Sequence, residues 1–184
     1  MSEFLQADRN VLRARRQWHY RGEQRPDFAL NPGPDEESVW DYPRPPRISA
    51  DRRRVEVRHE GELVASTSRA VRVLETASPP TFYITPEDVR QERLIESGRR
   101  SMCEWKGVAI DFDLKGGPDS VAWCYRQVFP EFASLAGWFA FYPARLDCRL
   151  DGERVRPQPG GYYGGWLTNE IVGPVKGEPG CDGL

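Results

Sequence analysis

Histidine is scarce in this sequence, and no two cysteines lie close together along the chain. Among 184 residues there are only two histidines, and no two cysteines are spaced as Cys-x-x-Cys. A structural zinc site needs several such ligands at short spacing, and a hydrolytic triad needs a histidine base. The sequence therefore disfavours a zinc knuckle and a Ser-His-Asp or Cys-His catalytic set. We predict neither a metal nor a cofactor.

Long apolar runs are also missing. No stretch approaches the roughly 18 uninterrupted apolar residues that a membrane helix needs. The first residues are acidic and polar, where an export signal would be basic and then apolar. We therefore expect a cytoplasmic protein with no membrane partner. In that reducing compartment the four cysteines are expected to remain thiols.

A surplus of positive charge is absent as well. The chain has 26 lysines and arginines against 28 aspartates and glutamates, which gives a formal net charge of -2. Non-specific binding to nucleic acid requires a surplus of cations, so we predict no nucleic-acid partner. Only three of the cations are lysines, namely Lys106, Lys115 and Lys176. Where arginine is used so consistently, a lysine is a candidate for a role that a guanidinium group cannot fill.

Prolines and glycines divide the chain into three parts. Residues 1–44 contain several prolines and glycines and end in a proline-rich linker, which predicts an N-terminal arm. Residues 45–157 carry the strand patterns and form the predicted core domain. Residues 158–184 are rich in glycine and aromatic side chains. This tail has too much apolar surface to leave in water, so we expect it to dock on the core or on a partner.

The core reads as a series of short strands. Alternation of polar and apolar residues predicts strands over 55–58, 63–65, 70–75, 81–84, 108–114, 121–125, 137–142 and 145–150. Turn signals at Glu60-Gly61 and Asp151-Gly152 predict hairpins. Residues 85–88 are typical of the start of a short helix, which we expect to end near residue 98. This pattern favours an antiparallel sandwich or barrel-like arrangement over alternating strands and helices.

Residues 103–107, Cys-Glu-Trp-Lys-Gly, are the best candidate for a site. Cys103 and Lys106 lie three residues apart at the entrance to a predicted strand. An ammonium group beside a thiol favours the nucleophilic thiolate, so these two residues are the candidates for a catalytic role. The alternative is structural: a buried cysteine, a core tryptophan, and a lysine paired with a carboxylate such as Glu75 or Asp88.

Other side chains are candidates for the walls of a ligand pocket. Aromatic rings with polar tips suit a flat organic ligand, although core packing explains such rings equally well. The aromatic candidates are Tyr83, Trp105, Trp123, Tyr125 and Tyr142. Arg72, Glu75 and Asp88 form a candidate charge cluster beside them. In an ideal strand Arg72 and Glu75 point to opposite faces, so both face a pocket only if a bulge intervenes, and a solvated pair is the alternative.

Four motifs, in order, carry a resemblance to a known family. They are residues 79–89 (PPTFYITPEDV), 103–107 (CEWKG), 122–125 (AWCY) and 136–142 (AGWFAFY). From residue 45 to residue 157 the chain resembles the family named domain of unknown function 427, and its arm and tail resemble extensions of longer members. The resemblance implies a mainly β, β-tent-like core, in which two antiparallel sheets lean together over a pocket, with one or two short helices. Many β-tent proteins hold zinc in paired Cys-x-x-Cys knuckles, which this chain lacks.

That family is sometimes labelled nucleotidyltransferase-like. Asp111 and Asp113 share a strand face, as the magnesium-binding carboxylates of such enzymes do. No phosphate-binding glycine-serine element precedes them. A solvated strand face therefore explains the two carboxylates better than a magnesium site.

The residues thus favour a small-molecule-binding protein with an aromatic cavity near residues 103–107, and they leave open whether it is an enzyme. Its predicted partner is an unidentified small molecule. The alternative is a non-catalytic interaction or homodimerisation module, in which the aromatic arm and tail clasp a partner or a second copy of the chain.

Overall fold

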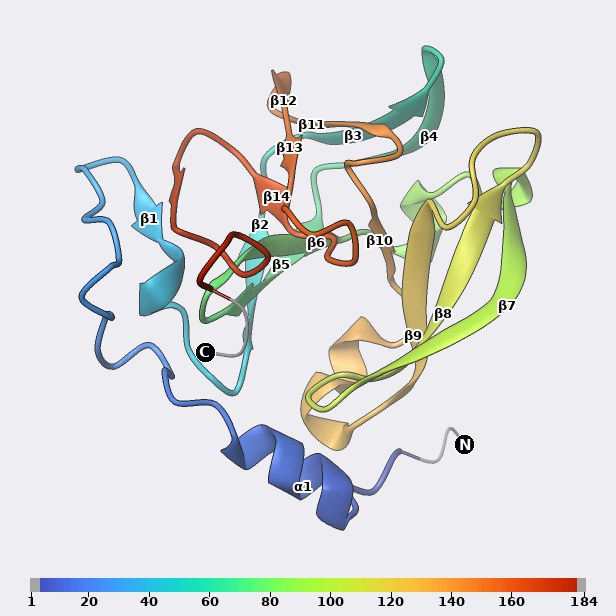
Figure 1. Ribbon diagram of the computed structural model, residues 1–184. Helices are drawn as coiled ribbons and strands as arrows, with labels where there is room; N and C mark the ends of the chain where they lie inside the picture. Colours follow the sequence, from blue (N-terminus) through green and yellow to red (C-terminus); the bar gives the residue numbers. More distant parts are fainter. Residues whose placement is uncertain (1–3, 182–184) are drawn as a thin grey trace.

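The computed structural model describes residues 4–181, and short strands in three antiparallel sheets dominate it (Figure 1). The first sheet has the order β10-β9-β8-β7, with the bounds Phe139–Phe141, Ala122–Val128, Gly107–Leu114 and Leu94–Cys103. The second sheet has the order β12-β11-β3-β4, with the bounds Glu153–Arg154, Asp147–Leu150, Val55–His59 and Glu62–Thr67. The third sheet has the order β2-β5-β6, with the bounds Arg47–Asp51, Ala70–Glu75 and Ser78–Tyr83.

The mainly β, antiparallel fold class expected from the sequence is confirmed. No closed barrel forms within residues 4–181. The helices are short, namely α1 (Arg9–Arg16) and the 3-10 segments η1 (Val39–Asp41), η2 (Pro86–Asp88), η3 (Gln91–Arg93) and η4 (Pro130–Leu135). In this part of the chain, no helix has both the length and the apolar character that a membrane crossing requires.

Two hairpins form where the sequence predicts them. Strands β3 and β4 pair up to His59 and Glu62, so the loop consists of Glu60 and Gly61 alone. Both loop residues have positive φ angles, 51° and 83°. This is the geometry of a type I′ turn, whose twist matches that of the strands it joins. Asp151-Gly152 forms the equivalent loop between β11 and β12, with φ angles of 48° and 85°.

The first and third sheets meet along a line at which β6 passes β10 (Figure 1). Just after β6, Ile84 exchanges two backbone hydrogen bonds with Phe139 of β10, with lengths of 2.8 and 2.9 Å. Neighbouring side chains on a strand point to opposite faces. Phe82 therefore packs into the largest apolar cluster of the core, whereas Tyr83 packs with Trp123 in a second cluster on the other face.

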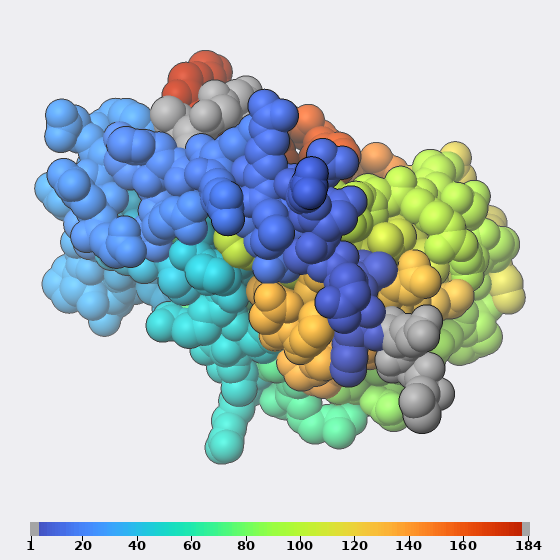
Figure 2. All heavy atoms as spheres, turned by 90° about the horizontal axis from the view of Figure 1, so that it is seen from below, coloured from blue at the N-terminus to red at the C-terminus, as the bar shows by residue number. Residues whose placement is uncertain are grey.

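The arm and the tail both pack against the core. Helix α1 begins after Asp8, whose side chain caps it by accepting a 2.9 Å hydrogen bond from the backbone of Val11. Strand β1 (Glu37–Ser38) of the arm pairs in parallel with β15 (Ile171–Val172) of the tail, and β13 (Arg156–Pro157) pairs with β14 (Trp166–Leu167). Trp40 and Trp166 are fully buried. Figure 2 shows the arm, in blue, running across one face of the molecule.

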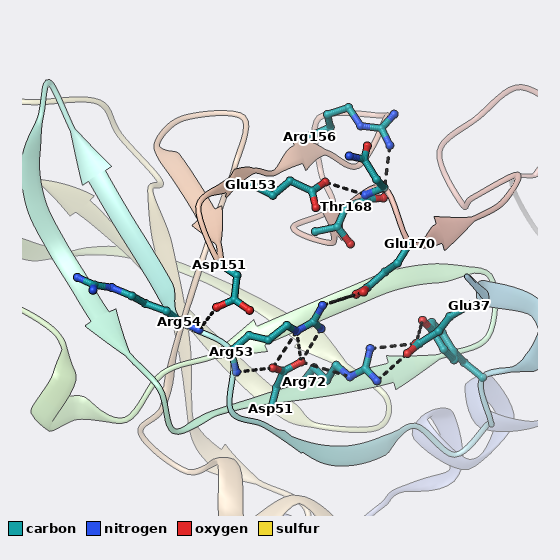
Figure 3. A network of polar contacts seen from close by, with 12 residues as sticks. Glu37, Asp51, Arg53, Arg54, Arg72, Asp151, Glu153, Arg156, Thr168 and Glu170 are labelled. Atoms are coloured by element: carbon teal, nitrogen blue, oxygen red, sulfur yellow. Dashed lines mark hydrogen bonds and ion pairs between the residues drawn. The ribbon is translucent and has the colours of Figure 1, made fainter. Parts of the chain in front are cut away.

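A network of ion pairs connects the arm, the core and the tail (Figure 3). Arg72 of β5 donates two hydrogen bonds of 2.9 Å to Glu37 of the arm and lies 3.7 Å from Asp51. Arg53 binds Asp51 at 2.6 Å and Glu170 of the tail at 2.7 Å. The backbone nitrogen of Glu37 then donates to the backbone oxygen of Glu170, which closes the ring. Arg72 thus serves to hold the arm in place.

The helix expected from residue 85 to about residue 98 does not form. Only the single turn η2 follows Thr85, whose side chain makes no capping hydrogen bond. Val89 instead forms a β-bridge with Ala65, and a second short turn, η3, leads into strand β7. The prediction was wrong because pairing between β7 and β8, on both sides of an irregularity between Glu96 and Arg100, overrides the helical preference of a segment rich in glutamate and arginine.

Candidate functional site

A cavity of about 600 Å³ lies between the first and third sheets, and the tail closes part of it. Its aromatic lining consists of Trp18, Tyr83, Trp123, Tyr125, Tyr142, Tyr162 and Tyr163. Its charged lining consists of Glu75, Arg99, Arg100, Glu104, Lys106, Asp111, Arg145 and Lys176. The structure therefore brings most of the sequence candidates together. Those on the cavity wall are Glu75, Tyr83, Cys103, Lys106, Trp123, Tyr125 and Tyr142.

An ion pair between Lys106 and Glu75 forms the floor of the cavity. The Nζ atom of Lys106 lies 3.3 Å from Oε2 of Glu75, and the two side chains are 11% and 17% exposed. Burial favours a neutral Glu75 carboxyl, but the charges of Lys106 and Arg44 outweigh it and hold the Glu75 pKa below its ordinary value. Burial likewise opposes the charge on Lys106, yet nearby Cys103 and Glu75 raise its pKa overall. Both groups of the pair are therefore charged at neutral pH.

The Cys-Glu-Trp-Lys-Gly motif is the turn of the β7–β8 hairpin. Cys103 pairs with Gly107, which leaves a three-residue loop. Gly107 has a φ angle of 130°, and a Cβ atom there would lie 2.9 Å from the Cα atom of Val128. Only glycine fits this position, so the turn has a fixed shape. The half-buried Cys103 and the buried Lys106 at this turn both line the cavity.

Tyrosine and tryptophan rings form the side walls. Tyr83 stands edge-on to Trp123 with 6.3 Å between ring centroids, and Trp123 contacts Tyr142 at 4.4 Å. Tyr125 lies 6.4 Å from Tyr83. Burial raises the pKa of Tyr83 to about 12, although the charge of Lys106 acts in the opposite direction. Burial also raises the pKa values of Tyr125 and Tyr142, so these phenols keep their protons and can donate hydrogen bonds to a ligand.

Three of the sequence candidates lie outside the cavity lining. Arg72 points to the opposite face of β5 and binds Glu37 of the arm, as alternation along an ideal strand requires. Asp88 binds Thr67 and Arg69 at the surface. Trp105 is buried beneath the arm.

The position of Trp105 follows from its contact with Arg15 of α1. The guanidinium group of Arg15 lies 5.1 Å from the centre of the Trp105 ring and 4.7 Å from that of Phe129. The same side chain donates a 2.7 Å hydrogen bond to the backbone oxygen of Glu104. Trp105 thus anchors the arm under the hairpin turn and does not face the cavity.

The two aspartates of β8 are paired with other side chains. Asp113 accepts hydrogen bonds from Arg99 and from the backbone of Ser120. Asp111 lies 3.9 Å from Arg99 and accepts a 3.3 Å hydrogen bond from Ser120. Within residues 4–181 no group of three or more histidine, cysteine or acidic side chains could hold a metal ion. Both aspartates therefore pair with Arg99, and of the two only Asp111 belongs to the cavity lining together with Arg99.

The sequence profile described as domain of unknown function (DUF427) matches residues 47–152, more than half of the chain. This chain belongs to that family. The match begins at β2 and ends in the β11–β12 turn, and it confirms the resemblance carried by the four motifs. A search of curated proteins found none that matches.

Part of the cavity wall comes from outside the DUF427 domain. Trp18 belongs to the arm, whereas Lys176 and residues 161–165 belong to the tail. Gly164 packs so closely on Trp123 that an added Cβ atom would lie 2.6 Å from Cζ3 of the indole ring. The tail is therefore fitted to the aromatic wall at this point.

Trp18 links the arm to the floor of the site. Its indole nitrogen donates a 2.9 Å hydrogen bond to Glu104 in the hairpin turn. The guanidinium carbon of Arg44 lies 3.6 Å from the centre of the Trp18 ring, and the Nζ atom of Lys176 lies 4.5 Å from it. Sequence reasoning missed Trp18 as a site residue. For Lys176 a signal existed, because it is one of only three lysines in the chain.

Proposed function

We propose that the chain binds a small organic molecule in the cavity between the first and third sheets. The observation that carries the proposal is the combination of aromatic walls with a charged pair at the floor. About 600 Å³ falls within the range of small-molecule sites, which are mostly apolar and contain a few convergent polar groups. The rings of Tyr83, Trp123 and Tyr142 suit a flat molecule, because aromatic groups pack well against one another in offset or edge-on contact.

The polar groups define what such a ligand could use. The phenols of Tyr83 and Tyr125 are protonated and offer hydrogen-bond donors. Lys106 is held by Glu75, so it is a fixed positive charge near Cys103. Cys103 and Lys106 remain our candidates for a catalytic role, with the thiolate as nucleophile and the ammonium as the group that stabilises it.

Native mass spectrometry on freshly purified protein tests the proposal. We expect an additional mass that is lost on denaturation, or uptake of flat aromatic compounds added from a panel. Thr81 lines the cavity, so Thr81→Trp should fill part of it and reduce uptake. Ser68→Trp places the same ring at an exposed turn and serves as the control. Equal uptake by the wild-type chain and Thr81→Trp, or no uptake by either, would contradict the proposal.

The alternative, a non-catalytic interaction or homodimerisation module, rests on apolar side chains that the arm and the tail leave exposed. Leu30 is 60% exposed and Tyr162 is 68% exposed. In contrast, Trp40 and Trp166 are used inside the chain itself. Sedimentation velocity over a range of concentrations tests this alternative. A dimer that Leu30→Ser dissociates would support it, and a monomer at all concentrations would count against it.

A further inference from the structure

Lys176 differs from the other lysine of the cavity in its contacts. Its Nζ atom lies 4.5 Å from the centre of the Trp18 ring and 5.0 Å from that of Tyr163. Within residues 4–181 it makes no ion pair with a carboxylate, whereas Lys106 lies 3.3 Å from Glu75. A half-buried ammonium group whose contacts are aromatic faces retains donors for an incoming anion.

The surroundings of Lys176 favour an anion as well. Its backbone is fixed, because the nitrogen donates a 2.7 Å hydrogen bond to Ala77 and the oxygen accepts a 2.8 Å bond from Gln158. Burial lowers the pKa of Lys176 below the ordinary lysine value, and the charge of Glu75 offsets only part of this effect. An anion beside Lys176 would supply the missing counter-charge. Cations also outnumber acids among the charged side chains that line the cavity.

We propose that Lys176 binds the acid group of the ligand, and that the ligand is an aromatic carboxylate whose ring packs against the tyrosine and tryptophan wall. This inference rests on the proposed function and deepens it by naming the class of ligand. A single carboxylate is the fitting acid group, because among residues 4–181 the ammonium of Lys176 has no carboxylate partner while that of Lys106 has one. The recognition group comes from the tail, so the DUF427 domain of residues 47–152 would lack it on its own.

Two probes of nearly the same shape separate charge from ring packing. 2-Naphthoic acid carries the carboxylate, and 2-naphthamide replaces it with a neutral amide. Isothermal titration of the full chain should show that the acid binds about tenfold or more tightly than the amide, because charge-assisted hydrogen bonds are stronger than neutral ones. Lys176→Gln should remove this preference, because it should weaken binding of 2-naphthoic acid and leave binding of 2-naphthamide unchanged. Lys176→Arg keeps the charge and should retain the preference.

Lys115 provides the matched control, because it is an exposed lysine in the turn after β8 and lies outside the cavity lining. Lys115→Gln removes the same charge and should bind both probes as the wild type does. Amide binding and thermal unfolding show whether each variant is folded. If the wild type binds both probes equally, or if Lys176→Gln keeps the preference, the inference is overturned while the pocket stands. If neither probe binds the wild type and no ligand copurifies, the pocket and the inference both fail.

Discussion

The substitution Glu75→Gln probes the floor of the cavity most directly. It keeps the size of the side chain but removes the negative charge, so the ammonium of Lys106 loses its carboxylate partner. The guanidinium of Arg44, which is fully buried and lies 3.5 Å from Glu75, loses the same partner. Removing one member of a buried ion pair costs about 3–5 kcal/mol, because an uncompensated charge remains.

Two features of the structure reduce this cost. Both side chains border a cavity, so water can reach the stranded ammonium, and Arg44 keeps a 2.9 Å hydrogen bond to the backbone oxygen of Thr76. We therefore expect Glu75→Gln to lower the free energy of unfolding by about 2–3 kcal/mol. For a chain of this length that corresponds to a fall in melting temperature of about 4–12 °C.

Urea and thermal unfolding, combined in a double-mutant cycle with Lys106→Met, measure the effect. Each single substitution should destabilise, and the double variant should lose less than the two single losses added together, because Lys106→Met removes the ammonium that Glu75→Gln leaves unpaired. Arg44 lacks its partner in both Glu75→Gln and the double variant, so its cost cancels in this comparison. A pH series adds a second test. The Glu75 pKa is lower in the folded chain than in the unfolded chain. The stability it contributes is therefore present above the unfolded value of about 4.3 and is lost as the pH falls through the folded pKa.

The control for Glu75→Gln is Glu131→Gln. Glu131 pairs with Arg15, but its side chain is 56% exposed, and exposed pairs contribute about 0–1 kcal/mol. The difference in melting temperature between the wild type and Glu75→Gln should be constant from pH 6 to pH 8, because the Glu75 carboxyl titrates only at a pH of about 4.3 and below. The difference should shrink in acid, where this carboxyl becomes protonated. A change no larger than that of Glu131→Gln at neutral pH would refute the assignment of the pair as the floor of the site.

The other predictions concern the tail and the candidate nucleophile. Gly164→Ala should destabilise the chain by about 1–3 kcal/mol and alter the tryptophan emission, because the new methyl group collides with Trp123; an unchanged melting temperature would mean that the tail does not pack there. Lys106→Arg should change the rate at which Cys103 is alkylated, because the larger, planar guanidinium group cannot take the place of a compact ammonium beside the thiol. Identical alkylation profiles would rule out coupling between the thiol and the amine.

Each of these two substitutions has a counterpart elsewhere in the chain. Gly33→Ala adds the same methyl group where the nearest atom is the flexible end of Glu36, at 3.3 Å, and should leave stability nearly unchanged. Lys115→Arg makes the same exchange at an exposed turn outside the cavity lining and should not affect Cys103. The remaining cysteines are buried, so alkylation of the folded chain reports on Cys103.

The features that the sequence predicts well are those determined locally. In the type I′ loops at Glu60-Gly61 and Asp151-Gly152, the glycines and Asp151 are residue types that tolerate positive φ angles. Alternation along β5 also places Glu75 and Arg72 on opposite faces, and the structure has Glu75 in the cavity and Arg72 bound to the arm. In these cases the neighbouring residues alone decide the geometry.

Strand β7 illustrates what the sequence could not reveal. Apart from Leu94 at its start, its residues are exposed or half-buried, and no alternating pattern marks them as a strand. It is the edge strand of the first sheet, so β8 alone pairs with it. Helical preference and edge pairing compete in such a segment, and the partner that decides the outcome lies in another part of the chain.

The site was predictable to the extent that the core motifs form it. The sequence predicts a cavity near residues 103–107 with aromatic walls, and Cys103, Lys106, Tyr83 of β6, and Trp123 and Tyr125 of β9 line the cavity in the structure. Trp18 and Lys176 belong to segments without the alternation of polar and apolar residues that marks a strand, and more than 150 residues separate them. Only the closed structure, in which the arm and the tail pair through β1 and β15, brings their side chains together.

The charges around Glu75 connect the family motif to both extensions. Lys106 comes from the hairpin turn, Arg44 from the end of the arm and Lys176 from the tail, and the charges of all three favour the ionised form of this one carboxylate. Each cation added to the cluster raises the free-energy cost of keeping the other cations charged, unless a further acid joins them. A ligand carboxylate at Lys176 would be that acid. The arm and the tail therefore do more than cover the core, because each adds a positive charge beside Glu75. In our proposal the carboxylate of a ligand balances the charge of Lys176.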